Sequence, residues 1–259
     1  MEVVYLIPGP MSQGPLGPEE LERRRAFLQT AAFPGTTVRV EDVSEGPPSI
    51  ESAYEEHLSV PGMLKAVGRL AEQGVDAVIV GCFGDPGVDA ARELVSIPVV
   101  GPGAAAMLFA CALGHRFSIV TVLDSIIHPL QRLAWDTGVP QKLASVRSVG
   151  IPVLNLYKDR DRLFRRVVEV GRACVKADGA DTLVLGCMTM AFAGQHRALE
   201  DALGVPVVNP ALAALKLAEA LAATGMTHSK LAFPVPPKLA AQGRRAPKSA
   251  TGHTAGRPS

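Results

Sequence analysis

The sequence predicts an α/β fold of two similar lobes, each with a parallel sheet flanked by helices and related to the other by an approximate two-fold axis. Short apolar segments alternate with helix-like stretches and Gly-rich turns, which is typical of parallel sheets covered on both faces. Residues 77–80 read Ala-Val-Ile-Val and are apolar throughout, as expected for a strand buried on both sides. A long internal repeat indicates that the unit occurs twice.

The hydrophobic pattern places strands and helices in alternation along the chain, and Gly residues mark the ends of several helices. The expected strands are 3–7, 38–43, 77–80, 99–100, 117–122, 146–151, 183–185 and 207–208. The expected helices are 19–32, 61–73, 88–95, 104–113, 125–135, 159–177, 191–203 and 211–223.

The repeat consists of Gly-x-Asp, an apolar strand and then Gly-Cys. It ends at Cys82 in one copy and at Cys187 in the other, 105 residues apart (187 − 82), and Pro-Val-Val follows in both copies. We expect residues 1–103 plus 210–233 to form lobe 1 and residues 104–209 to form lobe 2. Residues 234–259 are basic and rich in Pro, Ala and Gly, which predicts a disordered tail.

Both cysteines of the repeat follow the carboxyl end of a strand, where open α/β sheets bind ligands. A single free cysteine usually behaves as a small buried hydrophobe, and Cys111 and Cys174 are interpreted in that way. The equivalent positions of Cys82 and Cys187 favour a functional role instead. Two opposed thiols, one ionised, can invert a carbon next to a carbonyl by removing its proton on one face and returning a proton on the other. That chemistry requires no metal or organic cofactor.

Backbone N–H groups of the two Gly-Cys turns are expected to stabilise the enolate-like intermediate. The candidate residues are Phe83, Gly84 and Asp85 in the first turn and Met188 and Thr189 in the second. Asp85 is also a candidate helix N-cap.

Several segments together resemble the aspartate/glutamate racemase superfamily, and within it the hydantoin racemase branch. The most specific match is 81–87 with 89–93; segments 48–51, 60–62, 117–121 and 185–187 agree with it. The resemblance covers residues 3–233. It implies a cofactor-independent racemase, often a homo-oligomer, in which Cys82 and Cys187 are the two acid/base residues.

The resemblance also implies that Thr121 and the loop after the first strand bind the substrate, which makes Pro10 and Ser12 candidates.

Four features depart from the family pattern. The first loop is Pro-Gly-Pro-Met-Ser rather than Asn-Pro-Asn-Thr, and the second cysteine is followed by Met-Thr-Met-Ala-Phe rather than Ala-Gly-Met-Ala-Asp. Asn209 stands where Asp is common, and an acid expected near Ala104 is missing. We therefore expect a bulkier, more apolar cleft and a 5-substituted hydantoin with an apolar side chain as substrate.

Two other interpretations stay open at this point: a maleate-isomerase-like isomerase or a decarboxylase acting on a small diacid, with a single essential thiol, and a non-catalytic small-molecule binder. A net charge of +1 and 5% aromatic residues disfavour nucleic-acid binding. No apolar run suggests a membrane span, and the first residues do not resemble a secretion signal, so a cytoplasmic protein is expected. The run Arg23-Arg24-Arg25 is expected on an exposed helix face, and His128 on a surface or at a helix cap.

Overall fold

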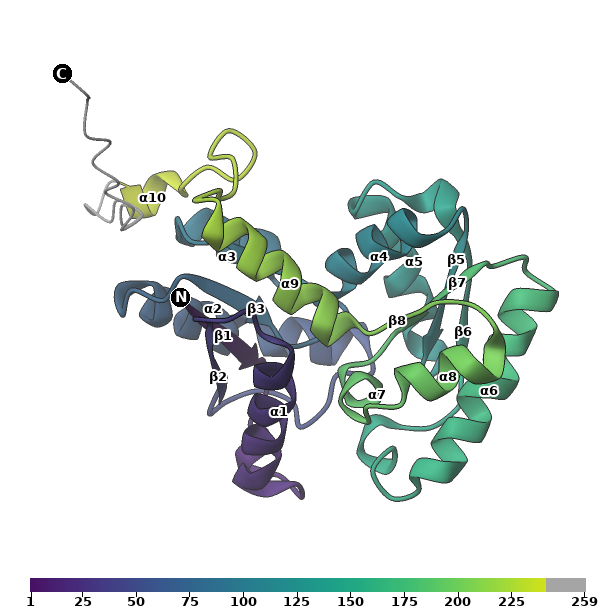
Figure 1. The fold of residues 1–259 in the computed structure, drawn as a ribbon. Helices are drawn as coiled ribbons and strands as arrows, with labels where there is room; N and C mark the ends of the chain where they lie inside the picture. Colours follow the sequence, from purple (N-terminus) through teal and green to yellow (C-terminus); the bar gives the residue numbers. More distant parts are fainter. Residues whose placement is uncertain (241–259) are drawn as a thin grey trace.

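The structure, a computed structural model, describes residues 1–240 and contains two parallel four-stranded sheets. The strand order is β2-β1-β3-β4 in the first sheet and β6-β5-β7-β8 in the second, so that each half has the same topology. Figure 1 shows the two sheets side by side, each with its own helices. The predicted fold class of two similar α/β lobes is confirmed.

Every strand is short, and helices or turns separate successive strands. The strands are β1 (Glu2–Ile7), β2 (Thr37–Asp42), β3 (Ala77–Val80), β4 (Val99–Val100), β5 (Phe117–Thr121), β6 (Leu143–Ser148), β7 (Thr182–Leu185) and β8 (Val207–Val208). The helices are α1 (Gly17–Ala31), α2 (Ala53–Glu72), α3 (Val88–Leu94), α4 (Pro102–Leu113), α5 (Ile127–Asp136), α6 (Arg160–Lys176), α7 (Met188–Phe192), α8 (His196–Leu203), α9 (Pro210–Ala223) and α10 (Pro237–Ala240). Short 3-10 turns lie at Met11–Gln13, Asp124–Ile126, Pro140–Lys142 and Val153–Asn155.

The central strands are buried on both faces, as their apolar sequences predict. All four residues of β3 and residues Val3 to Leu6 of β1 have no exposed surface. These two strands pair in parallel with Tyr5 opposite Ile79. In the second sheet β5 pairs with β7, with Ile119 opposite Val184. Both Gly-Cys turns therefore emerge at the carboxyl edge of a central strand pair.

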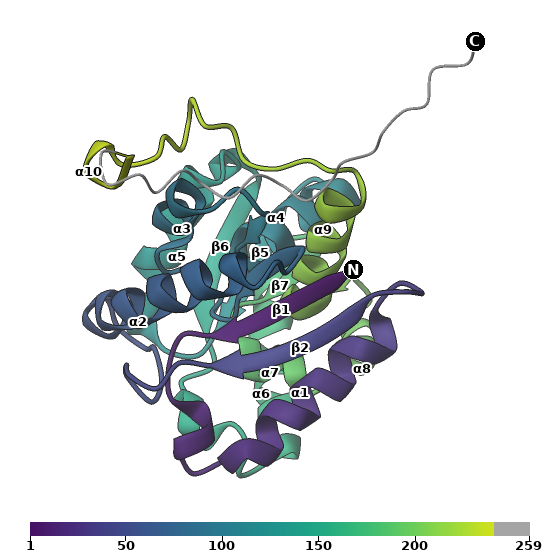
Figure 2. The ribbon, with the colours of Figure 1, turned by 90° about the vertical axis from the view of Figure 1, so that its left-hand side faces the viewer.

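Alternate residues of β1 face two different helical layers, because successive side chains of a strand point to opposite faces of the sheet. Tyr5 belongs to the apolar cluster that contains Leu28 of α1. Its neighbours Val4 and Leu6 belong to a second cluster, with Met63 of α2. Figure 2 shows α1 and α2 on opposite sides of β1 and β2. The first sheet is thus covered on both faces.

Helices α4 and α9 exchange partners between the two lobes. Helix α4 follows the first sheet along the chain but packs against β7 of the second, whereas α9 follows the second sheet and packs against β3 of the first. The two helices also pack against each other, and Figure 1 shows α9 leaving the second lobe to run along the first. In space, α4 therefore lies with the second sheet and α9 with the first.

Helix α2 begins at Ala53, eight residues before the predicted start. The prediction began at Pro61 because proline lacks the N–H that a helix interior uses. The structure tolerates Pro61 inside the helix. The stronger start signal is Ser52, whose hydroxyl oxygen accepts the N–H of Glu55 while the Glu55 carboxylate accepts the N–H of Glu51.

Three other elements differ from the prediction. The helix expected over 191–203 is split into α7 and α8, because Gly194 adopts a left-handed φ of 73°. Strand β6 ends at Ser148, three residues before the predicted end. Within the predicted tail, Pro237–Ala240 forms a short helix; positions 241–259 lie outside the described residues. No helix in residues 1–240 is long and apolar enough to cross a membrane.

The glycine before each cysteine lets the chain approach its central strand closely. A Cβ placed on Gly81 would lie 2.6 Å from Cε1 of the Tyr5 ring, and one placed on Gly186 would lie 2.6 Å from Cγ2 of Ile119. The backbone carbonyls of the two glycines accept hydrogen bonds from Tyr5 (3.2 Å) and Thr121 (3.0 Å). The same contact thus supports both turns.

We expect Gly81→Ala to lower the free energy of unfolding by about 1–3 kcal/mol, because the added methyl group overlaps a fully buried ring. Urea denaturation would measure this. Gly68→Ala is the matched control: Gly68 lies inside α2, and a Cβ added there would meet nothing within 4 Å. Alanine at that position should stabilise the protein by about 0.5–1 kcal/mol. Equal effects of the two substitutions would contradict the packing described.

Candidate active site

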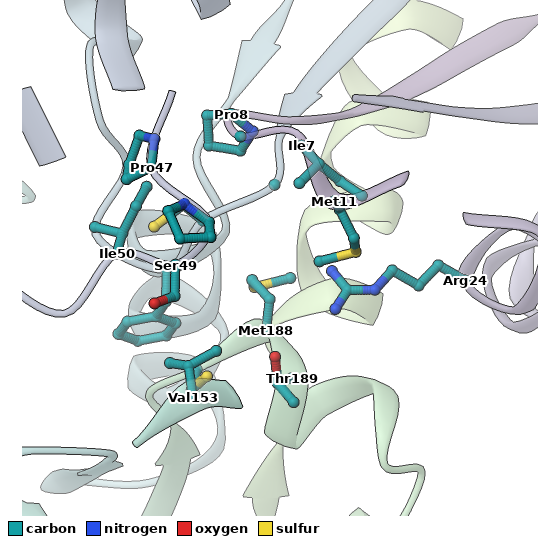
Figure 3. A pocket seen from close by; sticks show the side chains of 16 residues that line it. Ile7, Pro8, Met11, Arg24, Pro47, Ser49, Ile50, Val153, Met188 and Thr189 are labelled. Carbon is teal, nitrogen blue, oxygen red and sulfur yellow. The ribbon is translucent and has the colours of Figure 1, made fainter. Parts of the chain in front are cut away.

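A cavity of about 90 Å³ lies where the two Gly-Cys turns meet, and both lobes line it. Cys82 and Phe83 come from the first turn, and Cys187, Met188 and Thr189 from the second. The end of β1, the loops that follow β1 and β2, Arg24 of α1 and Val153 of lobe 2 complete the wall. Figure 3 shows side chains from these segments around one space. The remaining lining residues are Ile7, Pro8, Gly9, Met11, Arg24, Pro47, Pro48, Ser49, Ile50 and Gly81.

The first turn is held by Asp85. Its φ of 54° is unusual for a residue with a side chain. Its N–H donates to the carbonyl of Cys82 (3.2 Å), and its carboxylate accepts the N–H groups of Gly103 and Ala104 at 2.8 Å each. Asp85 therefore caps α4 rather than a helix of its own turn, and it ties the cysteine turn to α4.

The second turn is held by Asn209. Its side-chain oxygen accepts the N–H groups of Ala211 (3.0 Å) and Leu212 (3.3 Å) at the start of α9, and its Nδ2 donates to the carbonyl of Ala191 (2.9 Å). Asn209 is buried and does not line the cavity. It links α7, which begins directly after Cys187, to α9.

The surroundings of the two thiols differ in charge. Burial raises the pKa of Cys82 to about 12; the N–H of Gly84 opposes the shift, while Asp85 and Glu56 add to it. Burial also raises the pKa of Cys187, but the N–H groups of Met190 and Thr189 and the positive charge of Arg24 all oppose it. The acidic neighbours are therefore on the Cys82 side and the cationic one is on the Cys187 side, which favours the thiolate at Cys187.

Four of the substrate-binding candidates lie at the site. Phe83, Met188 and Thr189 line the main cavity, and Gly84 lines a smaller adjoining cavity whose wall also contains Cys82 and Cys187.

Three candidates are not brought to either cavity. Pro10 and Ser12 belong to the loop that reaches the cavity, but its lining residues are Pro8, Gly9 and Met11; the Ser12 N–H instead donates to Asp42 (2.6 Å). Thr121 is fully buried and donates to the carbonyl of Gly186. The structure thus gives Thr121 a supporting position behind Cys187.

Arg24 corrects one expectation from the sequence. It is 1% exposed and lines the cavity, whereas its neighbours Arg23 and Arg25 lie at the helix surface. Glu20, Arg24 and Leu28 are the buried residues of α1, four positions apart. That spacing places them on one helix face, and it was the signal that could have identified Arg24.

Comparison with known proteins agrees with this architecture. The family model described as Asp/Glu/Hydantoin racemase matches residues 22–218. The chain belongs to this family.

Individual members of the family are also similar over most of their length. The hydantoin racemase of Rhizobium meliloti is 37% identical over 221 residues, covering 84% of this chain and 86% of that protein. The hydantoin racemase of Pseudomonas sp. (strain NS671) is 37% identical over 204 residues, covering 78% of this chain and 81% of that protein. Among solved structures, allantoin racemase from Klebsiella pneumoniae has a TM-score of 0.81 at 34% identity, covering 91% of this chain and 94% of that one.

The pKa of Asp85 predicts a pH dependence of stability. Burial raises this pKa to about 7, although the N–H groups of Ala104 and Gly103 oppose the shift. Between roughly pH 4 and pH 7 the folded protein then binds more protons at this carboxyl than the unfolded chain, so its contribution to stability falls as the pH rises.

From about pH 4 to about pH 7, the free energy of unfolding of the wild type should therefore fall by about 2–4 kcal/mol relative to that of Asp85→Asn. Urea denaturation of both proteins at several pH values would measure it. A difference that does not vary with pH would show that Asp85 remains ionised in the fold.

Proposed function

We propose that this protein is a cofactor-independent racemase that inverts the carbon next to a carbonyl in a 5-substituted hydantoin or a related amino-acid derivative. The observation that carries the proposal is that Cys82 and Cys187, equivalent residues of the repeat, line one cavity from opposite lobes. The similarity to hydantoin racemases and to an allantoin racemase supports the substrate class.

In the proposed reaction the α-carbon of the substrate lies between the two thiols. The Cys187 thiolate, favoured by Arg24 and the N–H groups of Thr189 and Met190, removes the proton from one face. The Cys82 thiol then donates its proton to the other face of the planar intermediate. The reverse reaction exchanges the two roles, so that both directions use the same residues.

Charge that develops on the substrate carbonyl oxygen needs hydrogen-bond donors. The backbone N–H groups of Phe83 and Met188, which directly follow the cysteines, would supply them. The predicted donor Asp85 does not, because its N–H already donates to the carbonyl of Cys82. The walls contain Ile7, Met11, Phe83 and Val153, which exclude water and pack against apolar parts of the substrate.

We also propose that the protein is cytoplasmic and forms a homo-oligomer, with no nucleic-acid or membrane partner. All four cysteines are free, which is typical of a reducing compartment. Leu108, Phe109 and Leu113 of α4 are exposed, as is Trp135 of α5. Exposed apolar side chains of this size are common at interfaces between subunits.

The central test is Cys→Ser substitution at each cysteine. We expect both Cys82→Ser and Cys187→Ser to lower the rate of racemisation by at least about 100-fold, because a hydroxyl group is a much weaker acid than a thiol at neutral pH. Loss of the α-proton NMR signal in D₂O and loss of optical rotation would be followed on a chiral 5-substituted hydantoin. Cys111→Ser, within α4 and outside both cavities, should retain the wild-type rate.

If only one of the two substitutions abolished turnover, a one-thiol isomerase or decarboxylase would be indicated instead. If neither substitution affected α-proton exchange, or the wild type exchanged no hydantoin while still binding one, the protein would be a binder without this activity.

A further inference from the structure

The cavity contains a buried guanidinium group whose hydrogen-bonding capacity is only partly used. Arg24 Nε donates to Glu20 Oε1 (2.8 Å), and Nη2 lies 3.5 Å from the hydroxyl of Tyr157. The Tyr5 hydroxyl is a further polar neighbour of the guanidinium, and Nη1 donates to no carboxylate or carbonyl oxygen within residues 1–240. Figure 3 shows the guanidinium pointing away from its helix toward Met11 and Met188, across the space that the lining residues enclose.

The charge of Arg24 is only partly neutralised. Its one carboxylate neighbour within residues 1–240, Glu20, also accepts two hydrogen bonds from Arg23, through Nε (2.6 Å) and Nη2 (2.7 Å). Two guanidinium groups therefore share one carboxylate. The Arg24 guanidinium carbon lies over the Phe192 ring, 4.6 Å from its centroid, and this contact offsets a further part of the desolvation of Arg24. A buried cation with free donors is costly unless a second anion reaches it.

The other lining residues indicate where such an anion would come from. Arg24 is the single charged residue among those of residues 1–240 that line the main cavity. Apart from Glu20, which pairs with Arg24, the acids nearest the thiols are Glu56 and Asp85 on the Cys82 side, and Glu56 lines the smaller cavity beyond the cysteines. A substrate carboxylate would be repelled from that side and attracted to Arg24.

We propose that Arg24 binds a carboxylate on the substrate's side chain, so that the preferred substrates are hydantoins whose 5-substituent ends in a carboxylate. The inference rests on the proposed racemase function and names the substrate class of the same site. It replaces the sequence-based expectation of a purely apolar substituent. The planar fork of Nη1 and Nη2 suits a carboxylate, and Tyr157, which contacts Thr189 at 3.2 Å, holds the fork beside the second turn.

The experiment compares two substrates that differ only in charge: 5-(2-carboxyethyl)hydantoin and its neutral amide, 5-(2-carbamoylethyl)hydantoin. The value of kcat/KM for α-proton exchange in D₂O is measured for the wild type, Arg24→Gln and Arg24→Lys. We expect the wild type to prefer the carboxylate by roughly 10–100-fold, mainly through KM. Arg24→Gln should lower the turnover of both substrates, because the Cys187 thiolate loses its cationic neighbour. The loss should be roughly 10–100-fold larger for the carboxylate, so that the preference disappears, and Arg24→Lys should keep part of the preference.

Arg25→Gln is the matched control, since Arg25 lies on the same helix, has 41% of its side chain exposed and pairs with Glu22. It should leave the preference unchanged. Either of two results would overturn the inference and leave Arg24 a structural residue. The wild type could turn over the two substrates equally, or Arg24→Gln could lower kcat/KM by the same factor for both and keep the preference. If Arg24→Gln does not fold, Arg24→Lys is measured at high salt. An ionic contact would be contradicted if that variant kept the full preference for the carboxylate.

Binding separates this inference from the proposed function. Each hydantoin is added to the wild type and to Arg24→Gln, and the thermal midpoint is measured. If no hydantoin exchanges its α-proton, the racemase proposal fails. The anion site would still be supported if the carboxylate raised the thermal midpoint of the wild type more than the amide did and this difference were absent in Arg24→Gln. The absence of that difference would refute it.

Discussion

The site depends on the close approach of the chain to a central strand at two glycines. At Gly81 and Gly186 there is no room for a side chain, and a hydroxyl group from the neighbouring strand holds each glycine carbonyl. The next residue in each case is a cysteine. Because both sheets end in the same contact, the position of each thiol follows from the strand pairing rather than from a mobile loop. Such support is what proton transfer between fixed groups requires.

The two halves are equivalent in topology but not in charge. The first cysteine turn is tied to α4 through Asp85, and the second is tied to α9 through Asn209, so an acid makes the connection in one lobe and an amide makes it in the other. Arg24 adds a cation on the Cys187 side alone. Burial raises the pKa of both thiols, but the acids near Cys82 add to that rise whereas Arg24 opposes it at Cys187.

The sequence was sufficient to predict the fold and the positions of Cys82 and Cys187 at the ends of equivalent strands, because each has a local pattern: apolar strands, Gly-Cys turns and Pro-Val-Val segments. It did not lead to Arg24, because three consecutive arginines do not by themselves indicate which one turns inward; only the spacing from Glu20 and Leu28 does. The inward position of Arg24 depends on Phe192 and Tyr157, which lie in the other half of the chain. Thr121 shows the opposite case, a residue at the expected place in the chain whose hydroxyl is used by the backbone of Gly186.

The exchange of α4 and α9 between the lobes has a consequence for how such a molecule can originate. Each sheet is covered by a helix that belongs, in chain order, to the other half. This is the arrangement of a domain-swapped dimer built within one chain. A gene for a single half would yield a symmetric pair with two identical thiols facing each other. When the halves are joined in one chain, their sequences can differ, so that one cysteine can have an acid beside it and the other an arginine.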